Sequence, residues 1–301
     1  MCESKVTLDD RFQGSLLGLA LGDAIGATVE FCPRGSFAEL TTIVGGGAHN
    51  LKAGQWTDDT SMAICLAESL ISCNEFNAYD QMTRYYNWWK SGYNSSTGVC
   101  FDIGLTVKNA LIKFNNTKNP YSVNISSHSA GNGSIMRLAP IALYFYPSLE
   151  QTLEFAAASS RTTHAAPEAI ESCQLLGYII HRALNGDSKK DVLDASKQIF
   201  NESKVVDLAL GKYQLKKINE IKGSGYVINS LEAALWCFYK STSYREAVLM
   251  AANLGDDADT TAAITGQLAG AYYGLDGIPK HWQDILYKGK EIKEIALKLL
   301  H

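Results

Sequence analysis

Two acidic clusters, far apart in the chain, hold the residues whose types and spacing best suit chemistry. The stretch GQWTDDTSM contains the first cluster at residues 57–60, and NLGDDADTTAAITG contains the second at residues 256–261. Each combines aspartates with threonines immediately before an apolar segment. Two interpretations are open, because the same residue types cap helices and bind metal ions.

Helix capping explains only part of each cluster. Asp and Thr side chains accept hydrogen bonds from the free N–H groups at a helix start, and one such cap suffices. Capping leaves the adjacent carboxylates of Asp58 and Asp59 unexplained, and likewise the crowding of Asp256, Asp257 and Asp259. If the clusters met in space, their carboxylates would repel one another unless a cation lay between them. Such oxygen donors favour Mg²⁺, Mn²⁺ or Ca²⁺, and a set of this size can hold two ions.

Glycines spaced four apart mark the two segments that must position these clusters. Residues 11–31 and the segment after Asp259 each carry such a series: Gly14, Gly18, Gly22 and Gly26, then Gly266, Gly270 and Gly274. On a helix this spacing gives a smooth ridge, and close helix contact is its expected purpose, because each glycine costs about 1 kcal/mol relative to alanine. We expect these two helices at the crowded centre of an all-α fold.

Helical periodicity predominates elsewhere, and strand signals are sparse. Further helices are predicted at residues 61–72, 78–90, 103–114, 149–159, 167–184, 189–201, 229–239, 244–253 and 288–300. Residues 32–56 are expected to form a surface loop, and residues 185–222 a mobile, largely exposed connection. Because the chain has only 6 prolines and no Pro-rich or Ser-rich linker, one compact, orthogonal helical domain spanning residues 1–301 is predicted.

Composition excludes several classes of partner. A formal net charge of -4 disfavours nucleic acid as the main partner, because phosphate binding needs clustered basic residues. The 7 cysteines are odd in number and form no CxxC pair, which indicates reduced thiols. The polar N-terminus lacks the pattern of an export signal, and no apolar run is long enough to span a membrane. A cytoplasmic protein is predicted.

Three further features have both a functional and a structural interpretation. The AGNGS turn at residues 130–134 could cradle a phosphate with backbone N–H groups at the start of an apolar helix, or be an ordinary loop. His164 could equally be a buried structural histidine, and Tyr226 a packed tyrosine. Asp23, in LGDA, is expected to orient neighbouring loops.

Five motifs, taken in order, closely resemble those of the ADP-ribosylglycohydrolase family. They are GSLLGLALGDAIGATVEF, GQWTDDTSM, AGNGSIMRLAPIAL, SSRTTHAAPEAIES and NLGDDADTTAAITGQLAGAYYGLDGIP. The resemblance covers residues 14–279, nearly the whole chain. Within the family, the chain is most similar to the bacterial dinitrogenase-reductase-activating glycohydrolases, which remove ADP-ribose from arginine.

The resemblance implies an all-α protein with a binuclear centre between helices, occupied by two divalent cations, Mg²⁺ or Mn²⁺. The residues that match the family's ligands are Thr57, Asp58, Asp59, Asp257, Asp259 and Thr260. Asp256 matches no ligand, so we expect it to face solvent or to lie behind the ligands.

The resemblance also implies which residues act on the substrate. Glu30, in VEF, matches a glutamate that approaches the metals and the substrate in some members and swings away in others. Asp102, in CFDIG, matches an aspartate assigned to proton handling at the scissile bond in the arginine-specific branch, although Leu105 replaces an asparagine common in relatives. Asp102 or Glu30 is expected to move the protons. The diphosphate of ADP-ribose would be held by Ser129, Gly131, Asn132 and Gly133. His164 would line the ADP-ribose pocket without binding metal, and Tyr226 would stack on the substrate or contact its ribose.

The implied reaction is hydrolysis of the N-glycosidic bond that joins C1 of ADP-ribose to an arginine of a protein substrate. ADP-ribose would be the product, and a monomer is expected. One alternative is hydrolysis of serine-linked, poly- or O-acetyl-ADP-ribose. Another is a non-enzymatic ADP-ribose-binding or structural member. A metal-dependent phosphohydrolase would leave AGNGS and RTTHAAPE unexplained.

Overall fold

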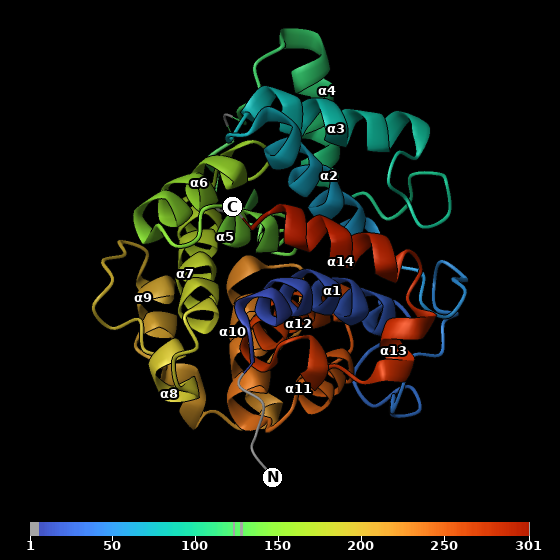
Figure 1. The fold of residues 1–301 in the computed structure, drawn as a ribbon, viewed down its shortest axis with the longest axis vertical. Coiled ribbons are helices and arrows are strands. Elements are labelled where there is room, and N and C mark those ends of the chain that lie inside the picture. Colours follow the sequence, from blue (N-terminus) through green and yellow to red (C-terminus); the bar gives the residue numbers. More distant parts are fainter. Residues whose placement is uncertain (1–5, 123, 127–128, 301) are drawn as a thin grey trace.

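The computed structural model describes residues 6–122, 124–126 and 129–300, and its regular structure is helical (Figure 1). Among these residues no β-strand forms, only isolated bridges from Gly46 to Leu51 and from Gly131 to Tyr226. The predicted all-α class is therefore confirmed. The α-helices are α1 (Leu8–Gly26), α2 (Asp58–Cys73), α3 (Ala78–Ser91), α4 (Leu105–Thr117), α5 (Ala139–Tyr144), α6 (Leu149–Arg161), α7 (Pro167–Leu184), α8 (Lys189–Val192), α9 (Ser203–Ala209), α10 (Val227–Lys240), α11 (Tyr244–Ala252), α12 (Ala258–Tyr273), α13 (Lys280–Ile285) and α14 (Gly289–Lys298). Short 3-10 helices are η2 (Lys212–Leu215), η3 (Ile218–Glu220) and η4 (Leu275–Gly277).

The two glycine-bearing helices, α1 and α12, run antiparallel to each other through the middle of the molecule (Figure 1). Gly14 faces Gly270, Gly18 faces Gly266, Gly22 faces Ala262 and Gly26 faces Ala258. A Cβ atom on any of these four α1 glycines would strike a backbone carbonyl of α12. The close helix contact predicted from the glycine spacing is confirmed, and the two ridges face each other.

Other helices enclose this central pair. Helix α14 packs on α1, while α7, α10 and α11 pack on α12 (Figure 1). The Arg11 side chain in α1 donates hydrogen bonds to the carbonyls of Ala183, Ala271 and Tyr272. These carbonyls lie at the C-terminal ends of α7 and α12, where helices leave acceptors unpaired. One arginine therefore ties three helix ends together.

The helix predicted at residues 189–201 is wrong, because α8 ends at Val192. Two residues later, Asp194 accepts hydrogen bonds from the backbone N–H and the hydroxyl of Ser196, at 3.1 and 2.6 Å. Such a side-chain turn competes with helical hydrogen bonding. The exposed connection predicted for residues 185–222 is only partly correct, since Tyr213 is buried whereas Leu215 is 91% exposed.

Residues 32–56 form the predicted loop and contain no helix. The loop packs back onto the end of α1, because a Cβ atom on Gly47 would strike the carbonyl oxygen of Ala27. The six described cysteines are all free, and Cys2 lies outside the described residues. Within the described ranges, no helix combines the length and apolarity that crossing a membrane requires.

Candidate active site

The start of α2 is organised by a carboxylate from another helix. Asp23, fully buried in α1, accepts from the backbone N–H and hydroxyl of Thr57 at 2.8 and 2.9 Å. Its second oxygen accepts from the N–H and hydroxyl of Thr60 at 3.0 and 2.6 Å. Asp23 thus satisfies N–H groups that α2 would otherwise leave unpaired, which extends the helix back beyond the predicted residue 61. Because Asp23 accepts these hydrogen bonds, the side chains of Asp58 and Asp59 are not needed to cap the helix.

The structure brings the two acidic clusters together. Thr57 precedes α2 and Asp257 precedes α12, so each cluster occupies the first turn of its helix. The Thr57 hydroxyl lies 3.4 Å from Asp59 Oδ2 and 3.2 Å from Asp259 Oδ2. The hydroxyl of Thr260 lies 3.4 Å from the same Asp59 oxygen. The two helix starts therefore converge on shared carboxylates.

These carboxylates are buried in an environment that resists negative charge. Burial raises the pKa of Asp58, Asp59 and Asp259 well above the usual range, and the neighbouring carboxylates raise it further. Asp59 Oδ1 is buried and finds no hydrogen-bond partner in the described part of the chain. A divalent cation would satisfy that oxygen and balance the charge, so this set of carboxylate and hydroxyl donors fits a hard metal ion.

A second group of ionisable residues lies beside this cluster. His49 Nε2 is 3.3 Å from Glu30 Oε2 and 3.4 Å from Asp102 Oδ1. One ligand atom from each of the three residues lies within 4.8 Å of the other two, so the group can hold a metal ion. Burial, and next the charge of Asp102, raises the pKa of Glu30 to about 9. Burial also raises the pKa of Asp102, although His49 opposes this change.

His49 belongs to the candidate site but could not be predicted from the sequence. It lies in the loop of residues 32–56, where no periodic pattern predicts a direction for a side chain. The only signal was the glycine run before it, since Gly47 permits the close approach to α1 described above. That approach brings His49 to Glu30, which follows α1.

The AGNGS turn contacts the acidic cluster through a side chain. Asn132 Nδ2 donates to Asp257 Oδ2 at 2.7 Å and to the hydroxyl of Ser230 at 2.8 Å, while its backbone N–H donates to Gly225 O. Sequence reasoning assigned Asn132 to a diphosphate. The structure shows that its amide holds Asp257 in place and that its backbone N–H is also occupied, so the turn offers a ligand the backbone of the flanking Gly131 and Gly133.

The expectation that AGNGS begins an apolar helix is wrong. The carbonyl of Asn132 accepts from the N–H groups of Ile135 and Met136, so the chain forms successive turns there. Helix α5 begins only at Ala139. Pro140 explains the delay, because its ring clashes with the carbonyl of the residue four positions earlier and is tolerated only in a first turn.

His164 lies against this turn. The residue is only 2% exposed, and a Cβ atom on Gly131 or Gly133 would come within 3.3 Å or 2.9 Å of its ring. Burial, and next the charge of Arg137, lowers the pKa of His164 to about 3. His164 Nδ1 is 2.8 Å from the hydroxyl of Thr163. A neutral imidazole therefore borders the glycine turn.

Two expected substrate residues lie outside the main pocket. The Tyr226 hydroxyl donates to Glu168 at 2.6 Å and accepts from Lys204 at 2.7 Å, while its backbone pairs with the AGNGS turn. Ser129 lines an adjoining pocket of about 320 Å³, which shares Leu105 with the main one. Both residues flank the site but do not line its central pocket.

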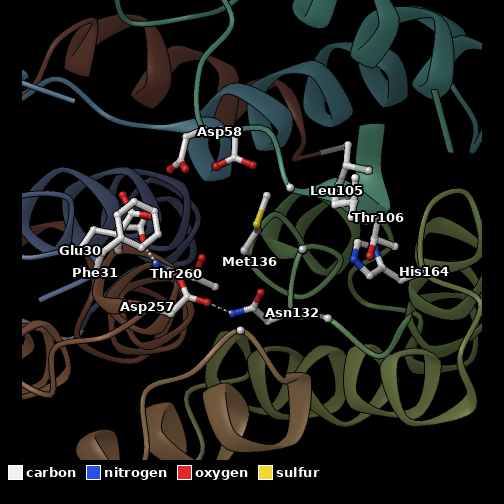
Figure 2. Close-up of a pocket in the computed structure, with 17 residues that line it drawn as sticks. Glu30, Phe31, Asp58, Leu105, Thr106, Asn132, Met136, His164, Asp257 and Thr260 are labelled. Atoms are coloured by element: carbon white, nitrogen blue, oxygen red, sulfur yellow. Dashed lines mark hydrogen bonds between the residues drawn. The ribbon is translucent and has the colours of Figure 1, made fainter. Parts of the chain in front are cut away.

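The remaining predicted residues surround a pocket of about 250 Å³ (Figure 2). The pocket is lined by Glu30, Phe31, Asp58, Asp102, Gly104, Leu105, Thr106, Val107, Gly131, Asn132, Gly133, Met136, His164, Gly225, Asp257, Asp259 and Thr260. Thr57 and Asp59 are fully buried and lie behind this lining. Figure 2 shows the carboxylates of Glu30, Asp58 and Asp257 toward one side and the ring of His164 on the opposite side. The pocket thus has an acidic end and a neutral end.

Phe31 borders the pocket in a strained conformation. Its φ angle is 63°, which bulky residues rarely adopt, and its side chain is 64% exposed. The N–H of Phe31 donates to Asp256 O at 2.7 Å, and the N–H of Asp256 donates to Cys32 O at 2.8 Å. This pairing joins the end of α1 to the loop before α12 and keeps an aromatic ring at the acidic end.

The fold and the pocket define an all-helical protein with oxygen ligands gathered at two converging helix starts. The chain belongs to the ADP-ribosylglycohydrolase family, whose sequence profile matches residues 4–301. A solved structure described as an ADP-ribosylglycohydrolase-related protein complex superimposes with a TM-score of 0.86 at 39% identity, covering 97% of each chain.

Two bacterial relatives show the position of the chain within the family. ADP-ribosylarginine hydrolase Tri1 of Serratia proteamaculans (strain 568) is 43% identical over 292 residues, which cover 97% of this chain and 79% of the relative. ADP-ribosyl-[dinitrogen reductase] glycohydrolase of Rhodospirillum rubrum is 31% identical over 283 residues, which cover 92% and 90%. The family resemblance predicted from the motifs is confirmed.

Proposed function

We propose that this protein hydrolyses the N-glycosidic bond between ADP-ribose and an arginine side chain of a modified protein, with ADP-ribose as product. The observation that carries the proposal is the convergence of the two acidic helix starts at one end of the pocket. The names of the two bacterial relatives support hydrolysis of this kind of linkage. The distribution of charge in the pocket also supports this reaction. The acidic end would hold the cations, and the neutral end beside His164, which has no carboxylate among the described residues, would take the part of ADP-ribose that lies away from the reacting bond.

We propose that two divalent cations, Mg²⁺ or Mn²⁺, occupy the acidic end. The proposed ligands are Thr57, Asp58, Asp59, Asp257, Asp259 and Thr260. Their oxygen donors, the raised pKa values of three buried aspartates and the unpartnered Asp59 Oδ1 support this assignment. When bound, such ions supply positive charge that orients substrate oxygens and acidifies water.

Proton transfer is assigned to Glu30 and Asp102. Burial, and next the charge of Asp102, favours the protonated form of Glu30, and in that form Glu30 would donate a proton to the departing guanidine nitrogen. Asp102, which has an oxygen within 4.8 Å of a Glu30 oxygen, would accept a proton from the attacking water. His49 contacts both carboxylates and keeps them beside each other.

The rest of the pocket is assigned to substrate binding. The backbone of residues 131–133 and the ring of His164 would contact the ADP part, with Ser129 and Tyr226 as flanking contacts. Phe31 would contact the arginine side chain, because an exposed ring beside carboxylates suits a guanidinium ion. Substrate binding away from the reacting bond then positions that bond for attack.

A linkage-resolved release assay tests this function. Peptides carrying ADP-ribose on arginine or on serine are incubated with the protein, with Mg²⁺ or with a chelator, and free ADP-ribose is measured. We expect release from the arginine-linked peptide with Mg²⁺ and none with chelator. Release from the serine-linked peptide alone would overturn the arginine assignment, and no release from either would favour a binding or structural member.

We also propose that residues 1–301 act as a single-domain monomer in the cytoplasm. One continuous buried core joins α1 through α14, which supports a single domain. The free thiols of the described cysteines support the location. Light scattering on the purified protein and cell fractionation test the oligomeric state and the location.

A further inference from the structure

Arg137 is fully buried behind the pocket, and its partners are neutral groups. Its Nη2 donates to the hydroxyl of Thr163 at 2.7 Å, its Nη1 lies 3.7 Å from the sulfur of Met62, and its guanidinium lies 4.6 Å from the ring centre of Tyr85. Burying a guanidinium without a carboxylate is costly. A specific task for this side chain is therefore expected.

The hydrogen bonds of Thr163 form a short relay that runs from Arg137 through the Thr163 hydroxyl to His164, and its direction is fixed. An arginine can only donate, so the Thr163 oxygen accepts from Arg137 and has one hydrogen of its own to donate. Thr163 is 1% exposed, and a buried hydroxyl hydrogen needs an acceptor. His164 Nδ1, at 2.8 Å, is that acceptor. Nδ1 therefore carries no proton, and the proton of the neutral ring is on Nε2.

Nε2 of His164 faces the glycine turn of the pocket. It is the atom nearest to where a Cβ atom on Gly131 would lie, at 3.3 Å, and it would be 3.2 Å from one on Gly133. Within the described part of the chain it makes no hydrogen bond. Figure 2 shows the ring of His164 at the end of the pocket opposite the carboxylates. An N–H donor without a protein acceptor thus borders the ligand cavity.

We infer that Arg137 and Thr163 are positioning residues that lock His164 as the neutral Nε2–H tautomer, a fixed donor to an oxygen of the bound ligand. The identity of that ligand as ADP-ribose rests on the proposed function, and a phosphate or a ribose oxygen would serve equally. The buried positive charge of Arg137 also opposes protonation of the ring, in agreement with its lowered pKa. The donor therefore keeps its direction and its neutrality across the physiological pH range.

The tautomer can be observed directly in the wild-type protein. Long-range ¹H–¹⁵N NMR of ¹⁵N-histidine-labelled protein distinguishes a protonated ring nitrogen from an unprotonated one. We expect His164 to show protonated Nε2 and unprotonated Nδ1, unchanged from about pH 5 to about pH 8. A proton on Nδ1, or titration of the ring in this range, would overturn the inference. This measurement needs no variant and no ligand.

Substitution of Thr163 tests the positioning role. Thr163→Val removes the hydroxyl at nearly constant volume, whereas Thr163→Ser keeps it. We expect Thr163→Val to give a mixture of tautomers and to weaken ADP-ribose binding about tenfold, as loss of one well-placed hydrogen bond would do, while Thr163→Ser stays within about twofold of wild type. If Thr163→Val changed neither the tautomer nor the affinity, the relay would not position His164.

Thr162→Val is the matched control. Thr162 is buried beside Thr163, but its hydroxyl donates to Ser159 O at 2.7 Å and accepts from Gln81 at 3.3 Å. Its loss is expected to leave the His164 tautomer and the ADP-ribose affinity unchanged, and an equal effect of both variants would contradict the relay. Failure of the wild type to bind ADP-ribose would refute the proposed function, while the NMR tautomer would still confirm or contradict the lock.

Discussion

At the scale of single residues, neighbouring carboxylates have different environments. Asp256 is exposed and has a φ angle of 57°, whereas the side chain of Asp257 is held by Asn132 at the edge of the pocket. The expectation that Asp256 would face solvent is therefore confirmed. A one-residue shift along the chain separates a carboxylate aimed at the proposed cations from one aimed at water.

Asp257→Asn and Asp256→Asn form a matched pair at this loop. Asp257→Asn removes a negative charge from the proposed ligand set, so we expect kcat/KM with arginine-linked substrate to fall by about 100-fold or more. Asp256→Asn should retain nearly full activity, because asparagine tolerates a positive φ and the group it replaces is solvated. Steady-state kinetics with saturating Mg²⁺ measure both. An equal loss in the two variants would show that the charge of the whole loop matters, rather than a ligand role of Asp257.

The candidate site could be predicted as far as local patterns extend. Crowded aspartates at two helix starts indicated carboxylates that would repel one another without a cation. Their convergence follows from the packing of the helices that carry them. His49 could not be predicted, because a loop residue acquires its neighbours only when the loop packs on α1. The role of Asn132 was also hidden, since its partner Asp257 is remote in sequence and an amide binds a carboxylate as readily as it approaches a phosphate.

At the scale of elements, the α1–α12 contact sets the distance between the proposed ligands and the residues that support them. Asp23 and Glu30 lie in or directly after α1, while Asp257, Asp259 and Thr260 begin α12. The glycine ridge lets the two backbones touch, and the carboxylates can therefore share one pocket. Periodicity predicted this contact because a side-chain-free ridge has few other uses. Helical periodicity gave a wrong prediction at residues 189–201, where the Asp194 side-chain turn competes with helical hydrogen bonding.

Gly22→Ala should separate the two central helices. A methyl group there would strike the carbonyl of Ala262, and backbone on both sides leaves no side chain to move away. We expect a loss of more than about 3 kcal/mol in the free energy of unfolding, together with lost activity.

Gly177→Ala in α7 is the control. Its nearest contact would be a Thr152 methyl at 3.4 Å, so helix propensity should keep its stability within about 1 kcal/mol of wild type. Urea unfolding measures both, and equal stability of the two variants would contradict the role of the ridge.

At the scale of the whole molecule, the buried carboxylates make stability depend on protons and cations together. An acid whose pKa is raised on folding binds protons more tightly in the folded state than in the unfolded one. Between the two pKa values, stability therefore falls as pH rises. Glu30, with a folded pKa of about 9, and the buried Asp58, Asp59 and Asp259 act in this direction. His164 acts oppositely, but only below its unfolded pKa of about 6.5.

The melting temperature of the chelated protein should therefore fall from about pH 7 to about pH 9, where several carboxylates and the buried thiols of Cys65 and Cys173, whose pKa values are raised, act together. Lys189, whose pKa is lowered by burial to about 8, acts oppositely but is a single group. Each proton that the folded state must release costs about 1.4 kcal/mol per pH unit within its titration range. Millimolar Mg²⁺ replaces those protons, so its stabilising effect should grow with pH over the same interval.

Thermal unfolding with Mg²⁺ and with chelator measures the difference. Asp256→Asn should behave like the wild type, while Asp259→Asn should respond less to Mg²⁺. A chelated protein whose melting temperature rises with pH, or a Mg²⁺ effect that shrinks with pH, would contradict the assignment of the buried carboxylates to cation binding.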